Sequence, residues 1–141
     1  MNAPKRARIL LIDDDADIGF AVQAILAQLD YEVAYCATGP AGMEAVRRER
    51  PALVLLDIML SHPTEGLQVA CQMRQDPQLK DIPIVFMSAM DEGSEQVYAR
   101  EVCPIALDAD MFLEKPLDAV TLRDAVEWVL RQISPPPNSG S

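Results

Sequence analysis

Residues 53–60 of this chain read LVLLDIML, and this stretch decides the fold. Its first four residues are apolar, a run too short for a buried helix but suited to a β-strand covered on both faces. The run ends at the carboxylate of Asp57. Because an ionised Asp costs several kcal/mol to remove from water unpaired, we expect a cation, a hydrogen-bond donor or a chemical role beside it.

Four other short stretches predict further strands, among them the loosely alternating residues 31–36, and helical patterns separate them. The additional strands are predicted at residues 9–12, 31–36, 82–87 and 110–114, and the helices at residues 17–29, 39–50, 65–75, 91–103 and 118–133. In the first helix, apolar residues at positions 18, 22, 25, 26 and 29 form a stripe that would face the core. Strands alternating with helices predict an α/β fold, a doubly wound five-stranded parallel sheet with helices on both faces.

The length and composition predict one domain. The chain has 141 residues, half of them apolar, which fits a single hydrophobic core. We expect an N-terminal arm at residues 1–6, the domain at residues 7–133, and a flexible Pro/Ser/Gly-rich tail or linker at residues 134–141.

The charge and the N-terminus restrict the partners and the compartment. The net charge is -10, with 22 acidic and 12 basic residues, which argues against duplex nucleic acid or an anionic membrane as partner. Only four apolar residues follow the basic N-terminus before three aspartates, so neither a signal peptide nor a membrane span is predicted. Three widely spaced cysteines suggest no disulfide framework and no zinc site, and we expect them reduced and buried in a cytoplasmic protein.

Polar residues end four of the predicted strands. These residues are Asp13, Asp14, Asp57, Ser88 and Lys115. The carboxyl ends of parallel strands lie at one edge of the sheet, where such folds bind ligands, so these side chains should converge. Taken singly, each has an ordinary explanation, such as a helix cap, a turn residue or a solvated lysine. Together at four strand ends they favour a binding site.

The chemistry of this cluster indicates phosphoryl transfer. Carboxylates about 4 Å apart repel by roughly 4 kcal/mol per pair at an effective dielectric of 20, so the site is suited to a divalent cation. Oxygen ligands favour Mg²⁺ or Mn²⁺ over zinc. A carboxylate beside such an ion, with a lysine and a hydroxyl within reach, can accept a phosphoryl group. Asp57 is the predicted nucleophile.

The segments ILLIDDD, LVLLDIML, VFMSAM and FLEKP resemble the receiver domain of bacterial two-component response regulators, which has a flavodoxin-like fold. The resemblance covers residues 7–133 and implies strand order 2-1-3-4-5. It also implies phosphorylation of Asp57 by a phosphohistidine of a sensor histidine kinase or a histidine phosphotransfer protein. Mg²⁺ would be held by Asp14, Asp57 and the backbone carbonyl of Met59, with Asp13 acting through water.

The same resemblance assigns the switch. Ser88, Ala89 and Lys115 would bind the phosphoryl group, and Ser88 and Phe112 would move together when it binds. The bond between Lys115 and Pro116 is expected to be cis. The last helix and strand, with the helix at residues 91–103, would form the face that meets an unidentified output partner, and a phosphorylation-dependent homodimer is one such output.

Two departures from the family affect this expectation. The loop at residues 57–66 is slightly longer than usual, and the span from residue 88 to residue 115 is several residues longer, with CPIALDAD inserted at residues 103–110. We expect the inserted segment to pack beside the helix at residues 91–103 and the strand at residues 110–114, to change its mobility on phosphorylation, and to help select the partner. Trp128 is either a half-covered flank residue of the last helix or an anchor for a partner.

Two alternative functions fit these residues less well. A phosphatase with an Asp nucleophile needs a second Asp two positions later, where this chain has Met59. An interaction module that works without phosphorylation would not need the full set of polar strand ends. The favoured interpretation is a phosphoacceptor that assists its own phosphorylation and dephosphorylation and is not an enzyme acting on free substrates.

Overall fold

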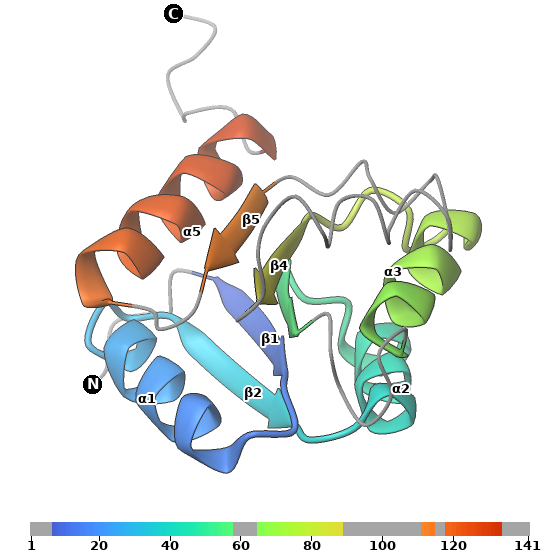
Figure 1. The fold of residues 1–141 in the computed structure, drawn as a ribbon. Coiled ribbons are helices and arrows are strands. Elements are labelled where there is room, and N and C mark those ends of the chain that lie inside the picture. Colours follow the sequence, from blue (N-terminus) through green and yellow to red (C-terminus); the bar gives the residue numbers. More distant parts are fainter. Residues whose placement is uncertain (1–6, 58–64, 89–110, 115–117, 134–141) are drawn as a thin grey trace, which may run out of the picture.

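The computed structural model describes residues 7–57, 65–88, 111–114 and 118–133 (Figure 1). In chain order the elements are β1 (Arg8–Ile12), α1 (Ala16–Ala27), β2 (Glu32–Cys36), α2 (Gly39–Glu49), β3 (Leu53–Asp57), α3 (Glu65–Gln75), β4 (Ile84–Ser88), β5 (Met111–Glu114) and α5 (Ala119–Ile133). The predicted helix at residues 91–103, the inserted segment at residues 103–110 and both expected terminal segments lie outside the described residues.

The strands form one parallel sheet in the order β2-β1-β3-β4-β5. In the two central pairs, Ile12 is level with Leu56, and Leu56 is in turn level with Phe86. Helices α1 and α5 cover one face of the sheet, and α2 and α3 cover the other (Figure 1). The predicted fold class and the strand order are therefore confirmed.

The central strand β3 is buried on both sides. Leu53 and Leu55 pack with α1 and α5, whereas Val54 and Leu56 pack with α2 and α3. Side chains of a strand alternate between faces, so a strand between two helix layers must be apolar at every position. This explains the continuous apolar run from which the fold was predicted.

Short polar side chains begin the first two helices. The carboxylate of Asp15 accepts the N–H of Asp17 at 2.9 Å and that of Ile18 at 3.5 Å, and α1 begins one residue earlier than predicted. The Thr38 hydroxyl accepts the N–H of Ala41 at 3.2 Å. Such caps satisfy backbone donors that the first helical turn leaves without partners. Both helices therefore start directly after the carboxyl ends of β1 and β2.

The fourth strand begins later than predicted. Residues 82–87 were expected to be extended, but the N–H of Ile82 donates to the Leu79 carbonyl at 3.0 Å, within a turn. Pro83 follows and has no N–H to donate. Regular pairing therefore starts at Ile84, which is level with Val54 of β3.

The cysteines differ from the expectation. Cys36 is a free thiol and is only partly buried. Cys71, on α3, takes part in a disulfide bond. The expectation that all three cysteines are reduced and buried is therefore wrong for Cys71. The sequence around a cysteine does not distinguish a buried thiol from a disulfide-bonded one. Since disulfides are rare in cytosolic proteins, this bond does not support the expected compartment.

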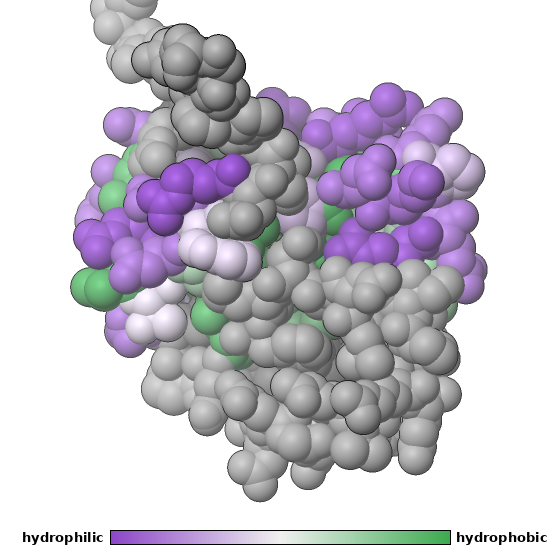
Figure 2. Space-filling model, turned by 90° about the horizontal axis from the view of Figure 1, so that it is seen from above, coloured by the Kyte–Doolittle hydropathy of each residue, from purple (hydrophilic) through white to green (hydrophobic). Residues whose placement is uncertain are grey.

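On the face of the molecule that Figure 2 shows, the surface of the described residues is mainly polar. Seen from above, it carries broad hydrophilic areas and smaller hydrophobic ones (Figure 2). Among the described residues, the large apolar side chains with substantial exposure are Phe20 on α1 and Val120 and Trp128 on α5, and Trp128 is 45% exposed. In the described part of the chain, no helix combines the length and the apolar character needed to cross a membrane.

Candidate functional site

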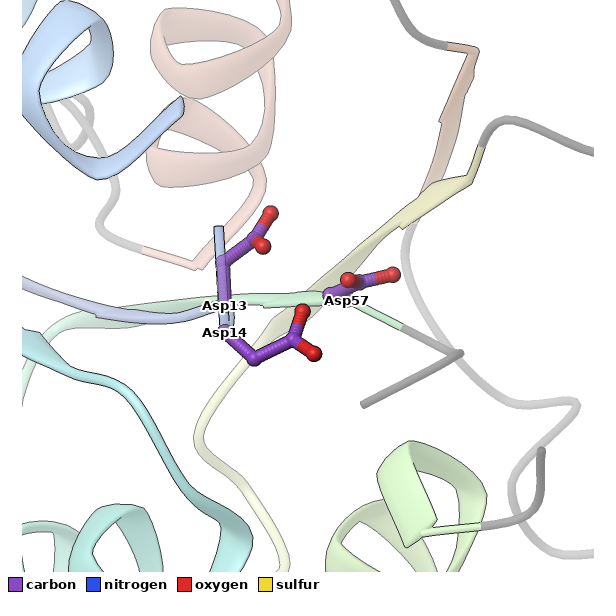
Figure 3. A group of neighbouring side chains, drawn as sticks. All are labelled: Asp13, Asp14 and Asp57. Carbon is purple, nitrogen blue, oxygen red and sulfur yellow. The ribbon is translucent and has the colours of Figure 1, made fainter. Parts of the chain in front are cut away.

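Three carboxylates meet at the carboxyl edge of the two central strands (Figure 3). Asp13 and Asp14 directly follow β1, and Asp57 is the last residue of the neighbouring strand β3. One oxygen from each carboxylate lies within 4.8 Å of the others. The predicted convergence of these three side chains is present in the structure.

The three carboxylates differ in exposure. Asp13 is 0% exposed and Asp57 is 4% exposed, whereas Asp14 is exposed. Two of the three carboxylates are thus largely removed from water. Two ionised carboxylates 4 Å apart would repel each other there by roughly 4 kcal/mol at an effective dielectric of 20. A group of oxygen ligands with this excess of negative charge is the kind of site that a hard divalent cation such as Mg²⁺ occupies. The cluster is consistent with a divalent metal site.

Hydrogen bonds hold Asp13 on three sides. Its N–H donates to the Cys36 carbonyl at 3.1 Å, and its own carbonyl accepts the hydroxyl of Tyr35 at 2.7 Å. Its Oδ1 atom accepts the N–H of Asp15 at 2.8 Å. The end of β2 thus positions the backbone of Asp13, and the N–H of Asp15, just before α1, positions its side chain.

The negative charges affect the phenol beside them. Burial first, and then the charges of Asp13, Asp14 and Asp15, raise the pKa of Tyr35 above its ordinary value of 10.0. Both causes disfavour the phenolate, because each penalises a further negative charge at this place. The hydroxyl therefore stays protonated near neutral pH and can donate to the Asp13 carbonyl.

The other predicted site residues are less completely described. Ser88 ends β4, the strand beside β3, so its backbone lies at the same edge of the sheet as Asp57. Phe112 belongs to β5 and is level with Phe86 of β4. The remaining predicted site residues, Met59, Ala89, Lys115 and Pro116, lie outside the described residues, and their roles stay predictions.

Two residues beside the cluster were not predicted from the sequence. Tyr35 was assigned only to a loosely alternating strand, and Gly19 was not singled out. A Cβ atom at Gly19 would lie 2.8 Å from Cε1 of Tyr35 and 2.9 Å from Cζ, so the ring rests directly on α1. Neither residue belongs to a short motif, and a contact between residues this far apart leaves no periodic signal.

Comparison with known families settles the affiliation. The family model described as the response regulator receiver domain matches residues 9–127. The chain belongs to the response regulator receiver family. This confirms the resemblance stated from the sequence and places the aspartate cluster in a family of phosphoacceptors that are generally not catalysts.

Two curated relatives differ in how much of their own length this chain covers. This receiver domain is 30% identical over 142 residues to "Probable transcriptional regulator ycf27" of Porphyridium aerugineum, covering 96% of this chain and 55% of that protein. It is 28% identical over 124 residues to "Protein PilH" of Pseudomonas aeruginosa, covering 88% of this chain and 98% of that protein. The chain therefore spans about half the length of the first relative and nearly all of the second.

A solved structure shares the arrangement of the receiver domain. It is described as a putative response regulator from Chloroflexus aurantiacus, with a TM-score of 0.78 and 25% sequence identity, covering 91% of this chain and 98% of that one. Membership of the family implies phosphoacceptor signalling with a histidine kinase as partner. It does not identify a particular kinase.

Proposed function

We propose that this receiver domain accepts a phosphoryl group on Asp57 from the phosphohistidine of a sensor kinase or a phosphotransfer protein, and that phosphorylation changes its binding to an output partner. The observation that carries the proposal is the meeting of Asp57 with Asp13 and Asp14 within 4.8 Å at the ends of two central strands. Family membership supports the same conclusion.

The environments of the three carboxylates favour Asp57 as the acceptor. Asp13 already accepts the N–H of Asp15 through Oδ1 and has no exposed surface. Asp14 is exposed, as suits a ligand to an ion that keeps part of its water. Asp57 ends the central strand and keeps a small exposed fraction through which a donor can approach.

The proposed transfer is a simple displacement at phosphorus. A carboxylate oxygen of Asp57 attacks, forming an oxygen–phosphorus bond while the nitrogen–phosphorus bond to the donor imidazole breaks. The imidazole nitrogen keeps the electron pair and takes a proton from solvent. The product is an acyl phosphate on Asp57 and a neutral histidine on the donor.

The residues that are present fit a bound Mg²⁺, or Mn²⁺ in its place. Asp13, Asp14 and Asp57 supply oxygen ligands, and the Met59 carbonyl is proposed as a further one from the family resemblance. When bound, the ion would supply positive charge to the oxygens of the phosphoryl group. Among the residues of this chain, Ser88, Ala89 and Lys115 are proposed to bind the transferred group.

The output surface is proposed on β5 and α5, with the segment at residues 91–103 beside them. Val120 and Trp128 are eight residues apart on α5, which places them on one side of the helix, and both are exposed. Contiguous exposed apolar patches mark partner sites, and these two side chains are proposed to belong to one. Phe112 of β5 is the proposed link to the phosphorylated site, and the partner is another protein or a second receiver domain.

Phosphorylation by acetyl phosphate tests this function. Wild-type protein with Mg²⁺ should incorporate about one phosphoryl group per chain, whereas protein in EDTA and the Asp57→Asn variant should incorporate none. The phosphatase alternative predicts a different result, continuous release of phosphate from an aryl phosphate without a stable adduct. Equal labelling of wild type and Asp57→Asn would contradict the proposal.

A further inference from the structure

The side chain of Tyr35 connects the second strand to the carboxylate cluster. Tyr35 lies on β2, and its ring packs against α1 at Gly19. The close approach, with a Cβ at Gly19 placed 2.8 Å from the ring, shows that any larger residue there would displace the phenol. The absence of a side chain at Gly19 therefore gives the ring its position.

The hydroxyl of Tyr35 is directed at one particular peptide group. It donates to the Asp13 carbonyl at 2.7 Å, and that carbonyl belongs to the peptide that joins Asp13 to Asp14. On the other side of Asp13, the N–H donates to the carbonyl of Cys36, the residue after Tyr35, at 3.1 Å. The end of β2 thus fixes both peptide groups of Asp13.

These contacts bear directly on the site. The orientation of the peptide between Asp13 and Asp14 affects the directions in which the two side chains leave the backbone, and one carboxylate is buried while the other is exposed. A cation that binds both of them requires their oxygens to stay close despite mutual repulsion. Groups that hold metal ligands in place commonly influence metal affinity without touching the ion.

We infer that Tyr35 is a positioning residue of the aspartate cluster, whose hydroxyl presets the Asp13–Asp14 peptide for a divalent cation, and that Gly19 is needed to place the ring. The inference rests on the proposed function, because it assumes that the cluster binds a cation. It assigns to β2 and α1 a part in metal binding that neither the family match nor the carboxylates themselves indicate.

The direct test is the Mn²⁺ affinity of the purified chain, measured by electron paramagnetic resonance. Tyr35→Phe keeps the ring and removes only the hydroxyl, and it should weaken Mn²⁺ binding about three- to tenfold. Gly19→Ala should weaken binding by a similar factor, because it displaces the same ring. If the two substitutions act through the same hydrogen bond, the double variant should bind Mn²⁺ no more weakly than the single variant with the lower affinity.

Tyr31→Phe is the matched control. Tyr31 is buried and lies just before β2, at the end of that strand away from the cluster. Removing its hydroxyl can lower the melting temperature of the metal-free protein but should leave the Mn²⁺ affinity within about twofold of wild type. A loss of affinity that merely followed lost stability would appear in this variant too.

A second measurement separates positioning from general damage. In phosphorylation by acetyl phosphate, Tyr35→Phe should raise the Mg²⁺ concentration needed for half-maximal rate and leave the rate at saturating Mg²⁺ close to wild type. A Mn²⁺ affinity of Tyr35→Phe within twofold of wild type, or an equal loss in Tyr31→Phe, would overturn the inference. Failure of the wild type to bind Mn²⁺ would instead refute the metal site of the proposed function, and the inference with it.

Discussion

At the scale of single residues, neighbouring aspartates of the β1–α1 turn have separate tasks. Asp14 contributes an exposed carboxylate to the cluster, whereas the Asp15 carboxylate caps α1. Asp15 also donates its N–H to Oδ1 of Asp13, but this contact comes from the backbone and does not depend on the side chain. Substituting the two residues should therefore have opposite consequences.

The first prediction compares Asp14→Ala with Asp15→Ala. Asp14→Ala should abolish stabilisation by Mg²⁺ while leaving the metal-free protein at least as stable, because one repelling charge is gone. Asp15→Ala should lower the free energy of unfolding by about 1 kcal/mol through loss of the cap and should keep the response to Mg²⁺. Thermal unfolding with and without Mg²⁺ measures both, and a normal Mg²⁺ response in Asp14→Ala would contradict the assignment of this ligand.

The three carboxylates of the cluster could be predicted from the sequence, but the residues that position them could not. Asp13, Asp14 and Asp57 could be found because each ends an apolar run, and the ends of parallel strands must share an edge. Tyr35 could not be found, because its contact with Asp13 depends on how β2 is placed beside β1 and on the ring resting on Gly19. Only the folded arrangement contains that information.

At the scale of elements, the close packing of α2 on β1 is set by a glycine. A Cβ atom at Gly42 would overlap Cδ1 of Ile12 and lie 2.8 Å from its Cγ1. Ile12 is buried and directly precedes Asp13. The contact between the helix and the strand therefore lies one residue away from the carboxylate cluster.

The second prediction concerns Gly42→Ala. Helix propensity alone would make this change stabilising by about 1 kcal/mol. We expect the overlap with Ile12 to dominate, so that the variant is destabilised by about 1 to 3 kcal/mol. Urea unfolding measures the difference. Adding Ile12→Val, which removes Cδ1, should restore part of the loss, and a Gly42→Ala variant more stable than wild type would contradict the packing described.

The third prediction is a pH dependence at the start of α5. Oδ1 of Asp118 accepts the N–H of Thr121 and Oδ2 accepts its hydroxyl, both at 2.8 Å. These bonds lower the pKa of Asp118 below its ordinary value of 3.8. A carboxyl with a lowered pKa stabilises the fold above the unfolded-state pKa, and this contribution is lost as the pH falls through the folded-state value.

Asp118→Asn provides the comparison, because asparagine can still cap the helix but does not titrate. Near pH 7 the two proteins should unfold at similar urea concentrations. As the pH falls below about 3.8, the wild type should lose stability relative to Asp118→Asn, while the other carboxyl groups titrate equally in both. Parallel stability curves down to the lowest pH at which both remain folded would contradict the role of this cap.

The elements themselves were largely predictable. Continuous apolar runs indicated strands buried on both faces, and the apolar stripe at positions 18, 22, 25, 26 and 29 does pack in the cluster with α5. The predicted start of β4 was wrong. The turn before Pro83 is formed by backbone hydrogen bonds, and the pattern of apolar residues does not indicate such bonds. The disulfide of Cys71 was missed, since pairing of cysteines depends on distance in the fold and not on sequence spacing.

At the scale of the whole molecule, the net charge of -10 and the aspartate cluster make the fold sensitive to cations in two ways. Any salt screens the general repulsion among surface charges. Only an ion that binds the cluster stabilises the native state by mass action. The two effects can be separated by comparing ions at equal ionic strength.

The fourth prediction is a specific increase in melting temperature with Mg²⁺. Stabilisation grows with the ratio of ion concentration to dissociation constant and reaches about 2.7 kcal/mol at a hundredfold ratio. NaCl at matched ionic strength should give a smaller increase, and Asp57→Asn should reduce the Mg²⁺ effect, since it removes one of the three carboxylates. If NaCl reproduces the whole effect, the cluster does not bind the ion.

The most direct test of the account is to locate the phosphoryl group. After treatment with acetyl phosphate and Mg²⁺, borohydride reduces an acyl phosphate to an alcohol, and peptide mass spectrometry then identifies the residue that carried it. Reduction is expected at Asp57 alone, and it should be present with Mg²⁺ and absent in EDTA. Reduction at Asp13 or Asp14, or an unreduced Asp57 in protein that has taken up phosphate, would contradict the central claim.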